Sequence, residues 1–130
     1  MNNGFSKVEQ LFFNLSGIEK ITTGIPYIAV ENFPKLGLLS SLRFLEWASE
    51  NPEGVVSLPT GKTAQHFINF TNILLENWGN KQGKEILEKY GLGGVKKPDL
   101  KGLQLVQSGE FYPINSSQHN SLFNYVSKYY

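Results

Sequence analysis

The segment with the clearest chemical potential is the short loop Pro59–Thr63, which links an apolar run to a helical pattern. A strand that ends in such a loop and continues as a helix places free backbone N–H groups at the positive end of a helix dipole. Gly61 allows close approach of the backbone, and Lys62 adds a positive charge. Hydroxyl groups come from Thr60 and Thr63. The pattern predicts an anion site, above all for phosphate. The alternative is an ordinary strand-to-helix turn capped by Thr63.

The loop contains Gly-Lys-Thr but differs from the Walker A loop that binds nucleoside triphosphates. That motif requires a second glycine five positions before the glycine that precedes the lysine. Val56 occupies that position, within the predicted strand. The loop is therefore too short to wrap a triphosphate, and its spacing argues against a P-loop ATPase.

A second loop, residues 108–120, also follows a predicted strand and contains Gly109 and Glu110. In parallel α/β sheets, ligands bind beyond the carboxyl ends of the strands. Both loops are therefore expected at the same edge of the sheet, where they would form one site.

The two segments together resemble the motifs of the glucosamine-6-phosphate deaminases. Ser57–Thr63 resembles the L-P-T-G-x-T-P phosphate loop of that family, and Gln107–Tyr112 resembles its D-E-[YF] segment. Asn120–Phe123 resembles the start of the helix that follows, E/N-S-Y/F-Y. Tyr27–Trp47 matches the first strand and helix of the family. The likeness covers about residues 27–130, which leaves residues 1–26 as an expected N-terminal extension.

This resemblance implies a fold and a reaction. The fold would be α/β, a three-layer Rossmann-like parallel sheet that is incomplete because the chain matches only the N-terminal half of the family domain. The family opens the sugar ring of an amino-sugar phosphate and abstracts a proton beside the carbonyl. It passes through an enolic intermediate to fructose 6-phosphate and ammonia. The resemblance assigns phosphate binding to Thr60, Gly61, Lys62 and Thr63, and part of the substrate pocket to Ser121.

The general base of the reaction is the main departure from the family. Gly109 stands where the family has the aspartate that moves the carbon-bound proton. A positioned base contributes on the order of 10² to 10⁴ in rate, and glycine has no side chain to supply one. Glu110 is the neighbouring candidate, but adjacent residues of an extended segment point in different directions. We therefore expect no catalysis by this chain alone.

No segment resembles the G-x-G-x-D-G-H-I-x-F-N-E-P stretch that carries the family's ring-opening histidine. We expect a truncated deaminase-like protein that binds glucosamine 6-phosphate or fructose 6-phosphate and needs no cofactor or metal. The alternatives are a non-catalytic sugar-phosphate-binding module and a subunit completed by another chain. Exposed edges of an incomplete sheet also predict self-association.

The composition supports this class of protein and excludes several others. Hydrophobic residues make up 40% of the 130 residues and the net charge is +1, so neither nucleic acid nor an anionic membrane is expected as a partner. Cysteine is absent, which excludes thiol chemistry and disulfides. The apolar runs fall short of the roughly 20 residues that span a bilayer. We expect no signal peptide and a cytoplasmic location.

Few other residues are candidates for catalysis. His66 and His119 are the two histidines, and Asp99 is the one aspartate. We interpret His66 as a polar residue in the first helical turn, His119 as a hydrogen-bonding loop residue, and Asp99 as a turn residue.

The elements that must position the two loops alternate between strands and helices, which favours a parallel sheet with right-handed crossovers. Apolar runs predict the strands, and spacings of three and four predict the helices. The predicted strands are Tyr27–Val30, Gly54–Leu58 and Leu103–Val106. The predicted helices are Val8–Leu15, Phe33–Ser49, one carrying the face Phe67–Trp78, Lys81–Tyr90, and one over Leu122–Tyr129.

Overall fold

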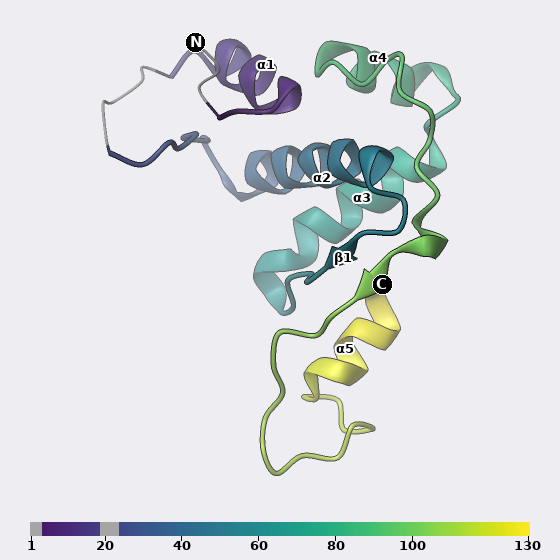
Figure 1. The fold of residues 1–130 in the computed structure, drawn as a ribbon. Helices are drawn as coiled ribbons and strands as arrows, with labels where there is room; N and C mark the ends of the chain where they lie inside the picture. Colours follow the sequence, from purple (N-terminus) through teal and green to yellow (C-terminus); the bar gives the residue numbers. More distant parts are fainter. Residues whose placement is uncertain (1–3, 19–23) are drawn as a thin grey trace.

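A computed structural model describes residues 4–18 and 24–130. Helices dominate one side of the molecule, and a short parallel sheet with one further helix lies beside them (Figure 1). The helices are α1 (Lys7–Ser16), α2 (Phe33–Glu50), α3 (Gln65–Glu76), α4 (Lys81–Lys89) and α5 (Leu122–Tyr129), with the 3-10 turns η1 (Lys62–Ala64) and η2 (Leu100–Gly102). The strands are β1 (Val55–Val56) and β2 (Gln104–Leu105).

The predicted helices are confirmed. They form where capping residues reinforce the apolar periodicity that predicted them. Ser6 caps α1 through a capping box in which its hydroxyl accepts from the N–H of Glu9 at 3.2 Å. Asn32 caps α2, its side chain accepting from the N–H of Lys35 at 2.9 Å. The C-cap of α2 is Asn51, directly before Pro52, as the proline predicts.

Helices α2 and α3 form the central packed pair. They approach closely at Gly37, where an added Cβ would lie 2.4 Å from the Cβ of His66. The buried Ser41 hydroxyl donates to the Phe67 carbonyl at 2.8 Å and accepts from the Thr71 hydroxyl at 3.1 Å. This buried polar network is satisfied, and it fixes α3 and the loop before it relative to α2.

The main hydrophobic core extends from this pair towards α1 and α4. Phe12 of α1 stacks on Tyr90 with ring centroids 5.1 Å apart, so α1 contributes to the same core as the rest of the chain. Residues 1–26, predicted as an extension, thus include a helix integrated into this core. The buried core residues are Val8, Phe12, Leu42, Leu45, Leu74, Leu87, Tyr90 and Leu92.

The sheet is parallel, as predicted from the alternation, but it is short. Val55 pairs with Gln104 and Val56 with Leu105. The prediction that Gly54–Leu58 is a buried strand is wrong in extent and burial, because Val55 is 59% exposed. Since the sheet has two strands within the described residues, β1 has a neighbour on one edge only. The fold is thus mixed α/β with a two-stranded parallel sheet.

The predicted strand Tyr27–Val30 is not formed. These residues have no regular secondary structure in the described part of the chain. Val30 packs against the helical core instead. Strand propensity mainly measures how well a side chain fits a paired, half-buried surface, and here the helices supply that surface in place of another strand. Within residues 4–18 and 24–130, no helix has both the length and the hydropathy needed to cross a membrane.

Candidate phosphate site

The loop after β1 turns sharply into α3. Gly61 adopts φ 86° and ψ −177°, a conformation open essentially to glycine alone. The Gly61 carbonyl accepts the N–H of Ala64 at 3.1 Å, and η1 then leads directly into α3. The sequence therefore uses glycine at the one position where the backbone must reverse to begin the helix.

This turn leaves backbone donors available. In the described part of the chain, no acceptor lies in hydrogen-bonding geometry with the N–H groups of Thr60, Gly61, Lys62 and Thr63. The residue before α3, Ala64, has no side chain that caps the helix. The predicted alternative, a Thr63 side-chain cap, is not formed, because η1 and α3 both lack a side-chain cap bond. Free N–H groups at a helix start attract anions.

Helix α5 lies against this loop. The Tyr125 hydroxyl donates to the Gly61 carbonyl at 3.0 Å, and the Tyr130 hydroxyl donates to the Pro59 carbonyl. The Tyr125 ring packs beside Ala64, Phe67 and Ile68. The contacts to this loop come from α5 itself, and within the described residues no hydrogen bond joins loop 108–120 to Pro59–Thr63.

Glu110, the alternative base, instead holds the start of α5. Its carboxylate accepts from the Ser121 hydroxyl at 2.6 Å and from the N–H groups of Phe123 and Leu122, both at 2.9 Å. The Ser121 hydroxyl, followed by the N–H of Phe123, lowers the pKa of Glu110 to about 2. A carboxylate that is this weakly basic and this fully bonded is a helix cap and a poor proton acceptor.

Ser121 is buried and belongs to the same cap. Besides donating to Glu110, its hydroxyl accepts from the N–H of Asn124 at 3.2 Å. Gly109 is exposed, and a Cβ added there would meet no atom within 4 Å. Position 109 therefore has room for a side chain, and the present residue provides none.

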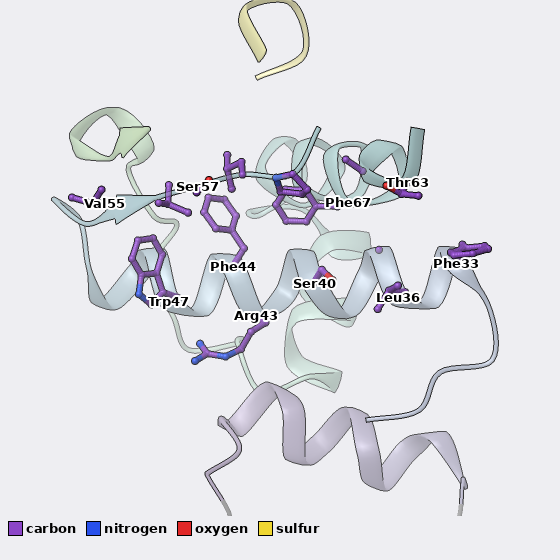
Figure 2. Close-up of a pocket in the computed structure, with 15 residues that line it drawn as sticks. Phe33, Leu36, Ser40, Arg43, Phe44, Trp47, Val55, Ser57, Thr63 and Phe67 are labelled. Atoms are coloured by element: carbon purple, nitrogen blue, oxygen red, sulfur yellow. The ribbon is translucent and has the colours of Figure 1, made fainter. Parts of the chain in front are cut away.

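A groove of about 820 Å³ ends at the phosphate loop. Figure 2 shows Phe44 and Trp47 reaching from α2 towards β1, while Arg43 turns towards α1, where it pairs with Glu9. Thr63 lies at one end of the groove. The remaining lining comes from one stripe of α2, from consecutive residues of the β1 segment, Val55 to Pro59, and from Ala64 and Phe67.

Within the described residues, β1 pairs with a strand along one edge only. Gly54 and Val56 direct their carbonyls to β2, where they accept the N–H groups of Gln104 and Val106, both at 2.9 Å. Alternation along a strand turns the backbone groups of the intervening Val55 to the opposite edge. The N–H and C=O groups of Val55 therefore lie on the edge of β1 that has no neighbouring strand among the described residues.

The remaining candidates lie away from this arrangement or are occupied. His66 packs its Cβ against α2, His119 is exposed, and the Asp99 carboxylate caps η2 by accepting the N–H of Lys101 at 3.1 Å. Across the described residues, no three acidic or histidine side chains gather to hold a metal.

Sequence reasoning missed the roles of Tyr125 and Tyr130. The sequence predicted only a helix over Leu122–Tyr129 and indicated no role for either hydroxyl. Their hydroxyls bond to carbonyls 64 and 71 residues earlier in the chain, and no short-range pattern signals such contacts.

Comparisons of the chain with family models, with curated proteins and with solved structures find no match.

Proposed function

We propose that this protein binds the phosphate group of a sugar phosphate, glucosamine 6-phosphate or fructose 6-phosphate, at Thr60–Thr63. The observation that carries this proposal is the set of free N–H groups at the start of α3, beside a glycine held at φ 86°. The exposed Lys62 adds a cation to the same turn. Backbone donors, helix dipole and ammonium group all favour a dianionic phosphate.

The groove supports a ligand larger than inorganic phosphate. Its volume falls within the range of roughly 300–1,000 Å³ typical of small-molecule sites, and Thr63 lies at its end. A phosphate bound at the loop therefore leaves room for an attached sugar. The resemblance to the deaminases selects a hexose phosphate of amino-sugar metabolism, in a cytoplasmic protein.

We further propose that this chain alone does not deaminate the sugar. Gly109 provides no base, and the Glu110 carboxylate is committed to the N–H groups of α5. Freeing Glu110 for proton abstraction would leave the N–H groups of Leu122 and Phe123 without their acceptor. The site is therefore better suited to binding the sugar phosphate than to converting it.

Titration calorimetry with glucosamine 6-phosphate tests the binding proposal. We expect saturable binding, with glucosamine lacking the phosphate as the control ligand that shows none. Equal heats for the two sugars, or no heat for either, would contradict a phosphate site.

The missing base leads to a separate prediction. Gly109→Asp should fold normally, because the added side chain enters open space. It should bind glucosamine 6-phosphate as the wild type does and release no ammonia, since one carboxylate does not supply the ring-opening histidine of the family. Ammonia release above the rate of the Gly109→Asn control would show that the rest of the catalytic site is present, and would overturn the proposal of inactivity.

A second candidate function, a subunit completed by another chain, is favoured by the free edge of β1. The α2 stripe from Phe33 to Trp47 is about 21 Å long at ~1.5 Å per residue, which is room for about six residues of extended strand. An added strand would hydrogen-bond to the backbone of Val55 and Ser57 and bury its apolar side chains against α2. A further strand would also extend the sheet towards the three-layer Rossmann-like fold.

Ser57→Pro tests this edge. Proline removes the outward N–H group and is tolerated at strand edges. We expect the wild type to self-associate as its concentration rises in sedimentation velocity, and the variant to associate less. Thr60→Pro is a control outside the strand. A wild type that stays monomeric at all concentrations would contradict association through this edge.

A further inference from the structure

We infer that Tyr125 and Tyr130 are positioning residues that orient the amides of the phosphate loop, so that α5 sets its affinity for phosphate. This inference rests on the proposed function, because it concerns the same site. It goes further by assigning control of the site to a helix that does not itself carry a ligand-binding group.

The geometry of the peptide bond links the tyrosines to the loop donors. In a trans peptide the C=O and the following N–H point in opposite directions. The Tyr125 hydroxyl holds the Gly61 carbonyl at 3.0 Å, so the N–H of Lys62 is directed away from α5. The Tyr130 hydroxyl holds the Pro59 carbonyl in the same way, which directs the N–H of Thr60 away from α5.

The loop needs such restraint because Gly61 is the residue least able to hold its own conformation. A glycine reaches positive and negative φ with similar ease, so the orientation of the peptide after it depends on hydrogen bonds. The Gly61 carbonyl accepts one from the Ala64 N–H at 3.1 Å and one from the Tyr125 hydroxyl at 3.0 Å. A rotated peptide would present its carbonyl oxygen to the phosphate in place of its N–H. A hydrogen bond to the Gly61 carbonyl selects the orientation that binds an anion.

Both phenols are suited to act as fixed donors. The Tyr125 ring packs against the cluster of Ala64, Phe67 and Ile68, and the Tyr130 ring lies 6.4 Å from the Phe67 ring. Burial raises the pKa of Tyr125, and burial followed by the proximity of Tyr125 raises the pKa of Tyr130 to about 12. The hydroxyls therefore keep their protons, and remain donors, throughout the neutral pH range.

Tyr129 provides a matched control on the same helix. Its ring lies 4.6 Å from that of Tyr125, yet its hydroxyl makes no hydrogen bond to the loop within the described residues. Tyr129→Phe thus removes a phenol hydroxyl from α5 without removing a bond to Gly61 or Pro59.

The test compares Tyr125→Phe with Tyr129→Phe by calorimetry, with glucosamine 6-phosphate and inorganic phosphate as the probes. We expect Tyr125→Phe to weaken both affinities roughly 3- to 10-fold, as loss of one hydrogen bond implies, and Tyr129→Phe to leave them unchanged. The thermal midpoints of the two variants should agree, because both keep the aromatic ring. A merely structural role would instead lower the midpoint of Tyr125→Phe without a specific change in phosphate affinity.

Tyr130→Phe is the second variant and should weaken phosphate binding without unfolding the protein, because it keeps the ring that lies beside Phe67. Binding by the wild type together with unchanged affinity in Tyr125→Phe and Tyr130→Phe would overturn the inference and leave the proposed function standing. Absence of binding by the wild type would overturn the proposed function, and the inference with it.

Discussion

Replacing Gly61 with alanine is expected to weaken phosphate binding by about tenfold or more. Gly61 sits at φ 86° and ψ −177°, where an L residue is strained by on the order of 1–3 kcal/mol. Alanine would favour a relaxed loop conformation, and phosphate binding would then have to restore the strained one. Each 1.4 kcal/mol of this strain lowers the affinity tenfold. Calorimetric titration of Gly61→Ala with glucosamine 6-phosphate measures the loss.

Gly109→Ala is the matched control for this experiment. An added Cβ meets no atom within 4 Å at either glycine, so steric clash is absent from both variants. Only Gly61 of the two has a positive φ. The control should bind as the wild type does. Equal affinities for the two variants would mean that the turn at Gly61 does not form the site.

Replacing Glu110 with glutamine is expected to loosen α5 at neutral pH. This helix has eight residues, a length at which isolated helices are marginal in water, so its end contacts matter. The carboxylate binds the N–H groups of Leu122 and Phe123 and complements the positive end of the helix. Glutamine removes the charge and offers one acceptor oxygen. Loss of helical backbone shifts in residues 122–129, measured by NMR, would report the change.

The pH dependence of α5 stability in the wild type is an independent test of the contact between Glu110 and this helix. The pKa of Glu110 is lowered to about 2 by Ser121 and the N–H of Phe123, against an ordinary value of 4.5. The stabilisation of α5 is therefore complete above about pH 4.5 and is lost as the pH falls towards 2. Glu110→Gln should show no such loss between these values, whereas Glu85→Gln, at an exposed position of α4, should behave as the wild type. Retention of the transition in Glu110→Gln would contradict the role of Glu110 as the helix anchor.

The helices were predictable because their signals are local. The spacing of Leu38, Leu42 and Leu45 placed α2, and Asn51-Pro52 placed its end, within one residue of the structure. The strands were less predictable because pairing is non-local. Tyr27–Val30 has strand propensity but forms no strand, and its residue Val30 packs against the helical core, an outcome that these four residues do not encode.

The candidate site likewise combines local features that the sequence predicts with non-local contacts that it does not. A strand, a glycine turn and a helix start follow one another in sequence, so the loop Pro59–Thr63 could be found from its pattern. The role of Glu110 could not, because it binds the N-cap residue Ser121, eleven residues later across an irregular loop. Capping patterns are read over three residues. The contact of Tyr125 with Gly61 spans 64 residues and depends on how α5 packs against α3.

The most direct test of the central claim is an NMR titration of the ¹⁵N-labelled protein with inorganic phosphate. If the turn before α3 holds the anion, the amide signals of Thr60, Gly61, Lys62 and Thr63 move in a saturable manner, ahead of those elsewhere in the chain. Sulfate as a second anion should move the same signals, and chloride at equal ionic strength should not. The account would be contradicted if the signals of these four amides stayed unchanged while other amides showed saturable shifts. It would also be contradicted if no signal shifted in a saturable manner.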